Sequence, residues 1–535
     1  MKELLLLLLT IKCIAGSPRV DPLVSTSQGL IRGVQAQDGD YDMFLGIPYA
    51  VVDEANPFGA ATPHPGFTDI FEANNDDTQC AQIDGTIFGV IQCLQLNVYV
   101  PNTADSAHKL PVMVYIHGGA FLRGSKRRAE FSPKLLIKHD VIVVNINYRV
   151  GLYGFLCLSE DGYNNQGLKD QVLAFKWIKE NIVAFGGDVN RITAFGESAG
   201  AMGLDLQLLA NENFAQRAIL QSGTSLTPWL IGPEADNIPI KVANHLGYEG
   251  ESVKDAVKFL SGLNPFDVIA TVNDLDVLNT TGHPRGKACV ERVTDDAFLT
   301  DHPINMKPKV KGMDIMIGHN SQEIMFIYPN SDEGYYRNYK FGSELILGFN
   351  DIYDEDIVRQ FYIGDESPSE KLQDEILTFG SDFVFVHPAE RNTLRYIEAN
   401  AKSIYKYMFS YEGDRNLLKV KKNLTSNGAA HGDELGYLFS SDLFKEVPNE
   451  RDQYVIDVIT KLWTNFAKYG NPTPETTDLI PLKWTPVTDG SKRPYLNIDN
   501  PVRMESRVFH ERMAFWDLYY KRNGDNIKGY SGNNC

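Results

Sequence analysis

Residues 191–200, RITAFGESAG, constrain the fold of this chain more than any other segment. A β-rich run over 191–195 leads into Gly196-Glu197-Ser198-Ala199-Gly200, and small residues and leucines then indicate a helix. Strand, sharp turn and helix are the context that the G-x-S-x-G pattern needs when its serine is a nucleophile. Glycines flank the serine because a β-carbon there would collide with the neighbouring turn. The segment predicts that Ser198 stands clear of the backbone and that the Ala199 N–H can bind an oxyanion.

Apolar runs rich in valine and isoleucine alternate with helical patterns along most of the chain, which is typical of an α/β fold with a large, mostly parallel sheet flanked by helices. Strands are predicted over residues 96–100, 112–116, 141–146, 191–195, 217–220, 313–317 and 404–409, and helices over 168–182, 198–209 and 454–469. A small antiparallel sheet is expected over 20–51. Residues 229–309 and 331–400 are predicted to be helical insertions, the second of them peripheral. Without a linker sequence, residues 17–535 are predicted to form one domain.

The N-terminus and the composition suggest a secreted, acidic protein. A charged start, an apolar stretch over 4–9 and small residues at Ala15-Gly16 predict a signal peptide over residues 1–16, and hence an extracellular location. No later stretch is long and uncharged enough to span a bilayer. A formal net charge of −18 over 535 residues argues against nucleic-acid binding. The chain lacks H-E-x-x-H and zinc-type cysteine spacing, so no metal or cofactor is expected.

Cysteines and sequons agree with that compartment. Five cysteines remain after Cys13 leaves with the signal peptide. Cys80 and Cys93 bracket a polar loop and are the best pair; closing it stabilises by about 3 kcal/mol in the chain-entropy model. Cys157 lies in an apolar run and is predicted to be a buried free thiol, whereas Cys535 lies on a polar tail that could pair between chains. The pairing of Cys289 stays open. Asn279 and Asn423 begin N-glycosylation sequons.

A serine nucleophile needs a base and an acid that orients the base. His431 lies among small residues in GAAHGDE, residues 428–434, after the predicted strand 404–409. Glu323 follows the strand 313–317, at the edge where open α/β sheets place their sites. Taken singly, His431 could be an ordinary loop histidine and Glu323 a surface glutamate. The order Ser198, Glu323, His431 is that of α/β-hydrolase triads, and it favours the catalytic interpretation.

The sequence HGGA over residues 117–120 follows the predicted strand 112–116. It is similar to the HGGG-type loop that supplies oxyanion donors in lipases and esterases. We assign the N–H groups of Gly119 and Ala120, together with that of Ala199, to the oxyanion hole. A phosphate-binding loop is the alternative, but no G-x-x-x-x-G-K-[ST] pattern occurs.

On these and further motifs the chain resembles the type-B carboxylesterase and cholinesterase family nearly end to end. The matching segments are FLGIPYA (44–50), CL (93–94) leading to LNVYVP (96–101), HGGA (117–120), NYR (147–149), GF (154–155), NQGLKDQ (165–171), FGGD (185–188) and FGESAG (195–200). The resemblance implies an α/β-hydrolase fold and a serine esterase with Ser198, Glu323 and His431 as its triad. It also implies supporting roles for Glu197 and Ser222 and a Cys80–Cys93 disulfide. Trp229 either lines the acyl pocket or packs in the core.

Departures from the family pattern bear on the substrate. Ile91-Gln92 replaces the usual acidic pair before Cys93, and no tryptophan lies between Cys80 and Cys93 to stack on choline. This argues against acetylcholine. Glu197 stands where juvenile hormone esterases usually have Gln, which weakens that alternative, and the retained triad argues against a non-catalytic adhesion protein. The overall resemblance is to insect secreted carboxylesterases, with odorant, pheromone, dietary and xenobiotic esters all open as substrates. The oligomeric state is also open.

Overall fold

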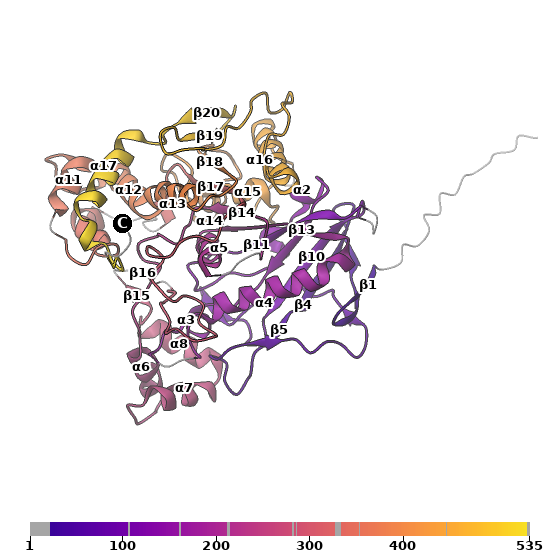
Figure 1. Ribbon diagram of the computed structural model, residues 1–535. Coiled ribbons are helices and arrows are strands. Elements are labelled where there is room, and N and C mark those ends of the chain that lie inside the picture. The colour runs from indigo at the N-terminus through magenta and orange to yellow at the C-terminus, as the bar shows by residue number, and fades with distance from the viewer. Residues whose placement is uncertain are drawn as a thin grey trace, which may run out of the picture.

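The computed structural model describes residues 22–104, 108–159, 162–210, 214–280, 283–284, 286–326, 333–352, 354–445 and 447–531. Within these ranges eleven strands form one twisted sheet that crosses the molecule (Figure 1). Their order is β20 (Arg503–Ser506), β19 (Pro494–Ile498), β18 (Ser403–Phe409), β17 (Asp314–Asn320), β14 (Arg217–Gln221), β13 (Gly187–Glu197), β11 (Leu110–Ile116), β12 (Ile142–Ile146), β10 (Gln95–Pro101), β4 (Tyr41–Pro48) and β3 (Val34–Gln35). The predicted signal peptide, Cys13 and Cys535 lie outside the described residues.

Strand direction divides this sheet into a parallel centre and antiparallel edges. Pairing is parallel from β12 through β11, β13, β14, β17 and β18 to β19. It is antiparallel where β20 joins β19, and where β10, β4 and β3 extend the other edge. The predicted mostly parallel sheet is confirmed, and each predicted apolar strand falls on one of these elements.

The N-terminal prediction holds in part. β1 (Leu23–Thr26) and β2 (Gly29–Arg32) form the expected antiparallel hairpin, which β7 (Phe71–Glu72) extends in parallel. The following strand, β4, instead pairs with β10 at the edge of the large sheet. Short two-stranded sheets join β5 (Ala50–Val51) to β6 (Thr62–Pro63), β8 (Gln82–Asp84) to β9 (Thr86–Phe88), and β15 (Asn279–Thr280) to β16 (His283–Pro284).

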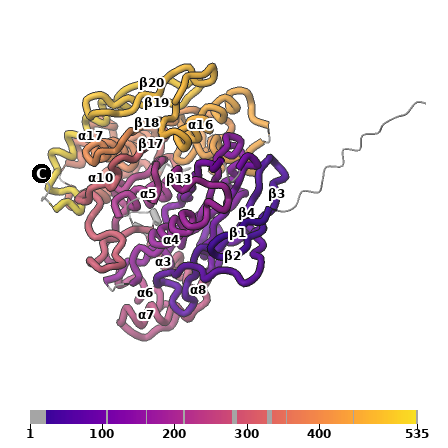
Figure 2. Tube along the Cα trace, turned by 45° about the vertical axis from the view of Figure 1, so that its right-hand side comes forward, coloured from indigo at the N-terminus to yellow at the C-terminus, as the bar shows by residue number. Residues whose placement is uncertain are grey.

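Helices cover both faces of the large sheet (Figures 1 and 2). Side chains alternate along a strand, so β11 sends Val112 and Val114 into one core and Met113 and Tyr115 into the other. The first core includes α4 (Gln166–Asn181) and α5 (Ala199–Ala210), and the second includes α2 (Lys134–Ile137), α15 (Leu435–Leu438) and α16 (Glu450–Tyr469). The three long helices expected from the sequence are thus confirmed.

Two helical insertions extend this framework. A separate apolar cluster joins α3 (Gly151–Phe155) to α6 (Asn237–His245), α7 (Val253–Ser261) and α8 (Pro265–Asp274), which form the lobe at the bottom of Figure 1. The second insertion contains α9 (Glu333–Arg337), α10 (Phe341–Leu345), α11 (Glu355–Ile363), α12 (Gln373–Ser381), a π-helix (Asp382–Val386) and α13 (His387–Glu398). The remaining described α-helices are α1 (Arg128–Phe131), α14 (Leu417–Lys422) and α17 (His510–Arg522).

The prediction that residues 331–400 are peripheral is wrong for the π-helix. Phe383, Val384, Phe385 and Val386 are all buried in the core that also contains the sheet strands. Four consecutive apolar residues point in every direction around a helix, so such a turn must be enclosed on all sides. This segment therefore reaches the centre of the molecule.

The cysteines give one confirmed and one wrong prediction. Cys80 and Cys93 form the expected disulfide, with their Cα atoms 4.8 Å apart. Cys157 is bonded to Cys289 and is not a free thiol. The two are 132 residues apart in sequence, and Asn165 brings them together by exchanging hydrogen bonds with the Cys289 backbone, at 2.8 and 3.0 Å. Sequence spacing alone could not reveal this contact between the loop after α3 and a helical insertion.

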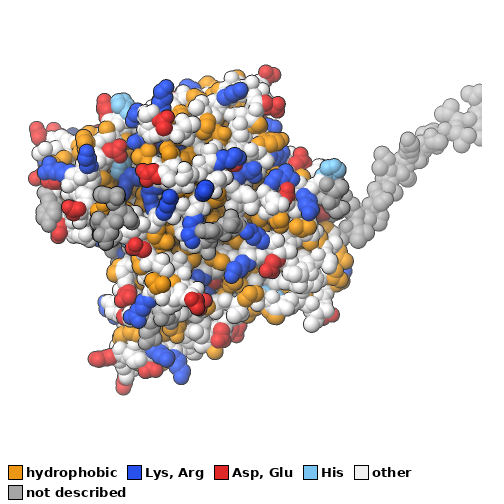
Figure 3. Space-filling view, viewed as in Figure 1, with side chains coloured by type: hydrophobic (Ala, Val, Ile, Leu, Met, Phe, Trp, Pro, Cys, Tyr) orange, Lys and Arg blue, Asp and Glu red, His pale blue; other side chains and the backbone are white. Residues whose placement is uncertain are grey.

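The surface carries interspersed charges of both signs on the face drawn in Figure 3. Lysines and arginines are scattered among acidic residues there and do not form one continuous stripe. Among the helices whose placement is described, none is both long and apolar enough to cross a membrane.

Candidate active site

Ser198 occupies a strained turn between β13 and α5. Its φ is 56°, in the left-handed region that L-residues with a side chain rarely adopt. A β-carbon on Gly196 would come within 2.6 Å of the Gly200 carbonyl carbon, and one on Gly200 would collide with the Ile116 carbonyl oxygen. Both flanking positions therefore require glycine. The strand-to-helix turn expected from the G-x-S-x-G pattern is present, and Ser198 is 9% exposed within it.

The HGGA loop lies directly against this turn. A β-carbon on Gly118 would be 2.9 Å from the Ser198 Cβ. Gly119 and Ala120 both have positive φ, 111° and 56°, and their N–H groups donate to no carbonyl of the described chain. The Ala199 N–H is also unpaired by the helix ladder, as in any first helical turn. The three N–H groups assigned from the sequence are thus available to an external acceptor beside Ser198.

His117 helps to hold the HGGA loop in place. Its ring stacks on Tyr148 with centroids 4.4 Å apart, and the Tyr148 hydroxyl donates to the His117 carbonyl at 2.8 Å. Burial lowers the pKa of His117 to about 4, so the ring is neutral at physiological pH.

His431 and Glu323 meet at the carboxyl ends of neighbouring strands. The Nδ1 of His431 lies 2.6 Å from a carboxylate oxygen of Glu323, and both side chains are buried. Burial by itself disfavours the imidazolium, but the Glu197 and Glu323 carboxylates outweigh it and raise the pKa of His431. The structure therefore brings together the base and acid that the sequence singled out 108 residues apart.

Glu197 faces the other nitrogen of the same imidazole. Its Oε1 lies 3.1 Å from Nε2 of His431, although the angle does not satisfy hydrogen-bond geometry. Burial raises the pKa of Glu197, while the neighbouring His431 lowers it. The Ser222 hydroxyl is also buried and has no hydrogen-bond partner among the described residues, and its backbone φ is 52°. Both side chains are buried close to Ser198, because Glu197 precedes it and the Ser198 N–H donates to the carbonyl of Gln221, the residue before Ser222, at 2.9 Å.

A buried polar network behind the base and acid escaped the sequence analysis. The Asn320 N–H donates to Glu323 at 2.6 Å, and its side-chain amide donates to the Ala430 carbonyl and to Glu434, each at 2.6 Å. Gln221 donates to the second oxygen of Glu434 at 2.8 Å. The position of Asn320 at a strand's carboxyl end, three residues before Glu323, was an available signal. Glu434 gave none, because its burial depends on three distant segments.

Two aromatic rings enclose the imidazole of His431. Phe326, three residues after Glu323, stacks on it with centroids 4.7 Å apart, and Phe385 of the π-helix approaches at 4.7 Å with a tilt of 43°. π-Helical turns occur often at functional sites, where they redirect a side chain. The periodic pattern of the sequence does not reveal such a turn.

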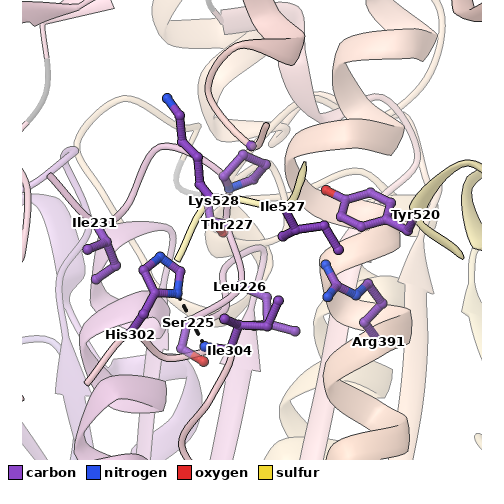
Figure 4. Close-up of a pocket in the computed structure, with 12 residues that line it drawn as sticks. Ser225, Leu226, Thr227, Ile231, His302, Ile304, Arg391, Tyr520, Ile527 and Lys528 are labelled. Carbon is purple, nitrogen blue, oxygen red and sulfur yellow. Dashed lines mark hydrogen bonds between the residues drawn. The ribbon is translucent and has the colours of Figure 1, made fainter. Parts of the chain in front are cut away.

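Trp229 is buried in the first core, with 6% of its surface exposed. Its loop closes a small cavity of about 30 Å³ (Figure 4). Leu226, Thr227 and Ile231 of this loop face Arg391 and Tyr520 across that space, and Trp229 is not among the residues that line it. Core packing of Trp229 is thus observed, and its role toward an acyl group stays a prediction.

The structure describes the N-glycosylation sequon at Asn423 fully, but only part of the one at Asn279. Asn423 is exposed at the end of α14, with φ of 53°. Asn279 lies in the short strand β15, and Thr281 of its triplet lies outside the described residues.

No cluster of three or more His, Cys, Asp or Glu side chains in the described ranges is arranged to hold a metal ion. Instead, the buried carboxyls of Glu197, the residue before Ser198, and of Glu323 lie on either side of the His431 imidazole. The imidazole can transfer a proton, and the N–H groups of the HGGA loop can stabilise an oxyanion.

Comparisons with known proteins match nearly the whole chain. A family model described as the Carboxylesterase family matches residues 20–516. The bile salt-activated lipase of Rattus norvegicus is 31% identical over 539 residues, which cover 93% of this chain and 85% of the lipase. The juvenile hormone esterase of Tribolium castaneum is 29% identical over 553 residues, covering 92% and 93% of the two chains.

Among solved structures, the juvenile hormone esterase from Manduca sexta with OTFP covalently attached superimposes with a TM-score of 0.80. The alignment covers 94% of this chain and 100% of that one, at 24% identity. This likeness concerns the fold, and together with the family match it confirms the expected α/β-hydrolase architecture.

Proposed function

The chain belongs to the carboxylesterase family and is a carboxylic ester hydrolase, and from that premise we propose that Ser198, His431 and Glu323 are its catalytic triad. The observation that carries the proposal is the 2.6 Å contact between Nδ1 of His431 and Glu323, beside a serine on a strained turn. A carboxylate at Nδ1 keeps Nε2 free to accept a proton and stabilises the imidazolium that results.

In the proposed mechanism the Ser198 hydroxyl attacks the ester carbonyl while Nε2 of His431 takes its proton. The N–H groups of Gly119, Ala120 and Ala199 stabilise the oxyanion. His431 then protonates the leaving alcohol, and an acyl group stays on Ser198. Water, activated by the same histidine, releases the carboxylic acid and restores the enzyme. Each step uses groups of this chain alone, and the proposal includes no cofactor.

Glu197 and Ser222 are proposed as supporting residues. The Glu197 carboxyl adds negative potential beside Nε2 and so favours the imidazolium that forms during attack. Ser222, whose hydroxyl has no hydrogen-bond partner among the described residues, is proposed to bind a water. Trp229, on the loop that follows β14, is proposed to form the inner wall of the acyl side.

We also propose that the enzyme is a secreted, N-glycosylated protein whose residues 17–535 form one domain after removal of the signal peptide. Two disulfides support an oxidising compartment. The exposed Asn423 supports glycosylation there, and Asn279 is proposed as the second site.

Odorant, pheromone, dietary and xenobiotic esters remain the candidate substrates. A specialised esterase of the juvenile hormone type is the second candidate, favoured by the 29% identity to the Tribolium castaneum enzyme over almost the full length of both chains. The two candidates share one mechanism, so a panel of substrates separates them. The contact between His431 and Glu323, beside a serine in a G-x-S-x-G turn, disfavours a non-catalytic binding role.

The decisive test is Ser198→Ala, with Ser343→Ala on the exposed face of α10 as the matched control. We expect kcat/KM toward aryl esters to fall by about 10⁵-fold or more in the first variant and to stay near native in the second. An organophosphate should label Ser198 stoichiometrically in the native enzyme. Substantial turnover by Ser198→Ala, or label on another residue, would refute the proposed triad.

A further inference from the structure

The small cavity drawn in Figure 4 has a positively charged wall, and we name it the Arg391 cavity. Arg391 of α13 and Lys528 of the C-terminal segment both line it. Its volume of about 30 Å³ has room for two water molecules or one monatomic ion. No aspartate or glutamate is among the described lining residues, although the whole chain has a formal net charge of −18. The local charge of this wall is therefore opposite to that of the protein.

Two buried hydroxyl groups belong to the same wall. Ser225 and Thr227, on the loop after β14, are 2% and 4% exposed, and neither hydroxyl has a hydrogen-bond partner among the described residues. The Ser225 backbone N–H donates to the buried Asp205 at 2.6 Å, which fixes the loop in place. Buried hydroxyls normally bind a partner, and the cavity that these two line is the space in which such a partner can lie.

The guanidinium group of Arg391 forms no ion pair with a carboxylate in the part of the chain that the structure describes. Its carbon lies 4.4 Å from the centre of the Tyr520 ring, and across the cavity it faces the loop that contains Thr227. Asp517 is close enough to sense this charge, but it already pairs with His387 at 3.1 Å and with Arg493 at 3.9 Å. A guanidinium that stacks on a ring keeps donors in its own plane for an anion.

Lys528 and His302 add further donors to the wall. The Lys528 ammonium donates to the Ile346 carbonyl and has two more N–H bonds to offer. Nδ1 of His302 accepts from the Ile304 N–H at 3.4 Å, so the ring proton lies on Nε2, which can donate. Burial lowers the pKa of His302 to about 4, and the ring is therefore neutral at physiological pH. A wall of cations, hydroxyls and an imidazole N–H suits an anion better than water, which needs acceptors as well.

We propose that the Arg391 cavity binds one monatomic halide ion, which is chloride under physiological conditions. The ion lies between the Arg391 guanidinium and the hydroxyls of Ser225 and Thr227, with Lys528 and His302 as additional donors. The cavity volume is too small for sulfate, phosphate or a carboxylic acid. This site is separate from the proposed triad, so the inference goes beyond the proposed function and does not depend on it.

The bound ion joins segments that meet at this cavity. The Lys528 N–H donates to the Gly348 carbonyl at 3.0 Å, and the Asn305 side chain donates to the Gly529 carbonyl at 2.9 Å. These bonds hold the C-terminal segment against the end of α10 and the 301–306 segment. The ion adds a link from the C-terminal segment to the loop after β14 and offsets two like charges. Halide should therefore stabilise the folded protein, because it binds the native state and not the unfolded chain.

The first experiment measures chloride binding to the full chain by the line width of the ³⁵Cl NMR signal, with bromide as competitor. The native protein should give broadening that saturates and that bromide reverses. Arg391→Gln should weaken chloride binding at least about tenfold, because it removes a charge-assisted hydrogen bond. Lys521→Gln is the matched control, since it removes one positive charge at the residue after Tyr520, outside the described lining. Equal affinities in these two variants, or no saturable binding by the native protein, would overturn the proposal.

A second variant tests the hydroxyl contact without a change of charge or shape. Thr227→Val should weaken chloride binding about threefold or more. Its control is Thr393→Val, because the Thr393 hydroxyl is also buried but donates to the Ala389 carbonyl at 2.8 Å. Thr227→Val keeps the volume of the side chain, so it tests the site even if Arg391→Gln does not fold. Native affinity in Thr227→Val would remove its hydroxyl from the site and contradict the proposed position of the ion.

Thermal unfolding gives an independent measurement. At fixed ionic strength, replacing sodium gluconate by sodium chloride should raise the Tm of the native protein by about 1 to 2 °C, because gluconate is too large for the cavity. Lys521→Gln should keep this difference, and Arg391→Gln should lose it. In gluconate, Thr227→Val should be at least as stable as the native protein, since an unpaired buried hydroxyl is costly. The same Tm difference in the native protein and in Arg391→Gln would show a general salt effect and overturn the site.

Bromide-soaked crystals locate the ion directly. We expect an anomalous peak within the Arg391 cavity of the native protein and none there in Arg391→Gln. Density without an anomalous signal would identify water and overturn the proposal. A bromide peak without saturable chloride binding in solution would show binding at crystal concentration only, and that result would overturn it too.

Discussion

The two halves of the active site are built from different materials. The half that binds the carbonyl oxygen consists of backbone: Gly119, Ala120 and Ala199 present N–H groups on turns that glycine makes possible. The half that handles protons consists of buried side chains from distant segments, with His431 and Glu323 in contact at 2.6 Å. The first half comes from two short turns that follow the neighbouring strands β11 and β13, whereas the second joins side chains after β17 and β18.

This difference determines how strongly amino-acid substitutions in each half should affect activity. A backbone donor cannot be removed by changing its own side chain, only by displacing the turn that aims it. A side-chain acid or base can be removed with a single isosteric substitution. We therefore expect the largest loss of activity from the side-chain half and a smaller, geometric loss from the backbone half.

Among changes that leave the Ser198 nucleophile in place, Glu323→Gln should give the largest effect. The amide keeps the shape of the side chain but loses the charge that sets the His431 tautomer, so kcat/KM should fall by about 10⁴-fold. Glu291→Gln is the control, because Glu291 is also buried and accepts hydrogen bonds, from Asn165 and Lys169, but has no proposed role in catalysis. Steady-state kinetics on both variants measure the effect. A loss below about tenfold in Glu323→Gln would show that the acid lies elsewhere.

Gly119→Ala tests the backbone half. Its φ of 111° and the nearby Arg123 carbonyl oxygen leave no room for a β-carbon, so the turn and its N–H groups must move. Losing one oxyanion donor costs about 100- to 1,000-fold in kcat. Gly247→Ala controls for backbone strain, since Gly247 has φ of 99° and open space around it. Near-native kcat in Gly119→Ala, measured with an aryl acetate, would remove Gly119 from the oxyanion hole.

The smallest effect concerns pH. The Glu197 carboxylate favours the protonated form of His431, so Glu197→Gln should lower the pKa of His431. Catalysis needs the neutral imidazole, and the acid limb of kcat/KM should therefore move toward lower pH, by about one unit. Glu434→Gln should move it less, because Glu434 contributes less to the raised pKa of His431. An unchanged or upward-shifted limb in Glu197→Gln would contradict this electrostatic role.

Some parts of the active site could be predicted from the sequence, and others could not. The Gly196-x-Ser198-x-Gly200 turn and the HGGA loop were recognisable because each is a short glycine-containing segment directly after a predicted strand, even though the contacts that exclude a β-carbon at Gly118 and Gly200 join the two segments. Asn320 and Glu434 were missed, because their contacts join three segments that are adjacent only in the folded sheet. The Cys157–Cys289 bond was missed for the same reason, and Cys157 was wrongly predicted to be a free thiol.

By itself, the sequence determined the alternation of strands and helices that indicates a mostly parallel sheet, the two tight turns, and the chain order of Ser198, Glu323 and His431. These features follow from interactions between neighbours, namely side-chain periodicity and backbone sterics. Only the tertiary structure decided that the π-helix brings Phe385 to His431, that Asn320 links acid and base loops, and that Arg391 lines a cavity with the loop after β14. Those features depend on packing between segments that are distant in the chain; Asn320 and Ala430, for example, are 110 residues apart. No local sequence pattern encodes such contacts.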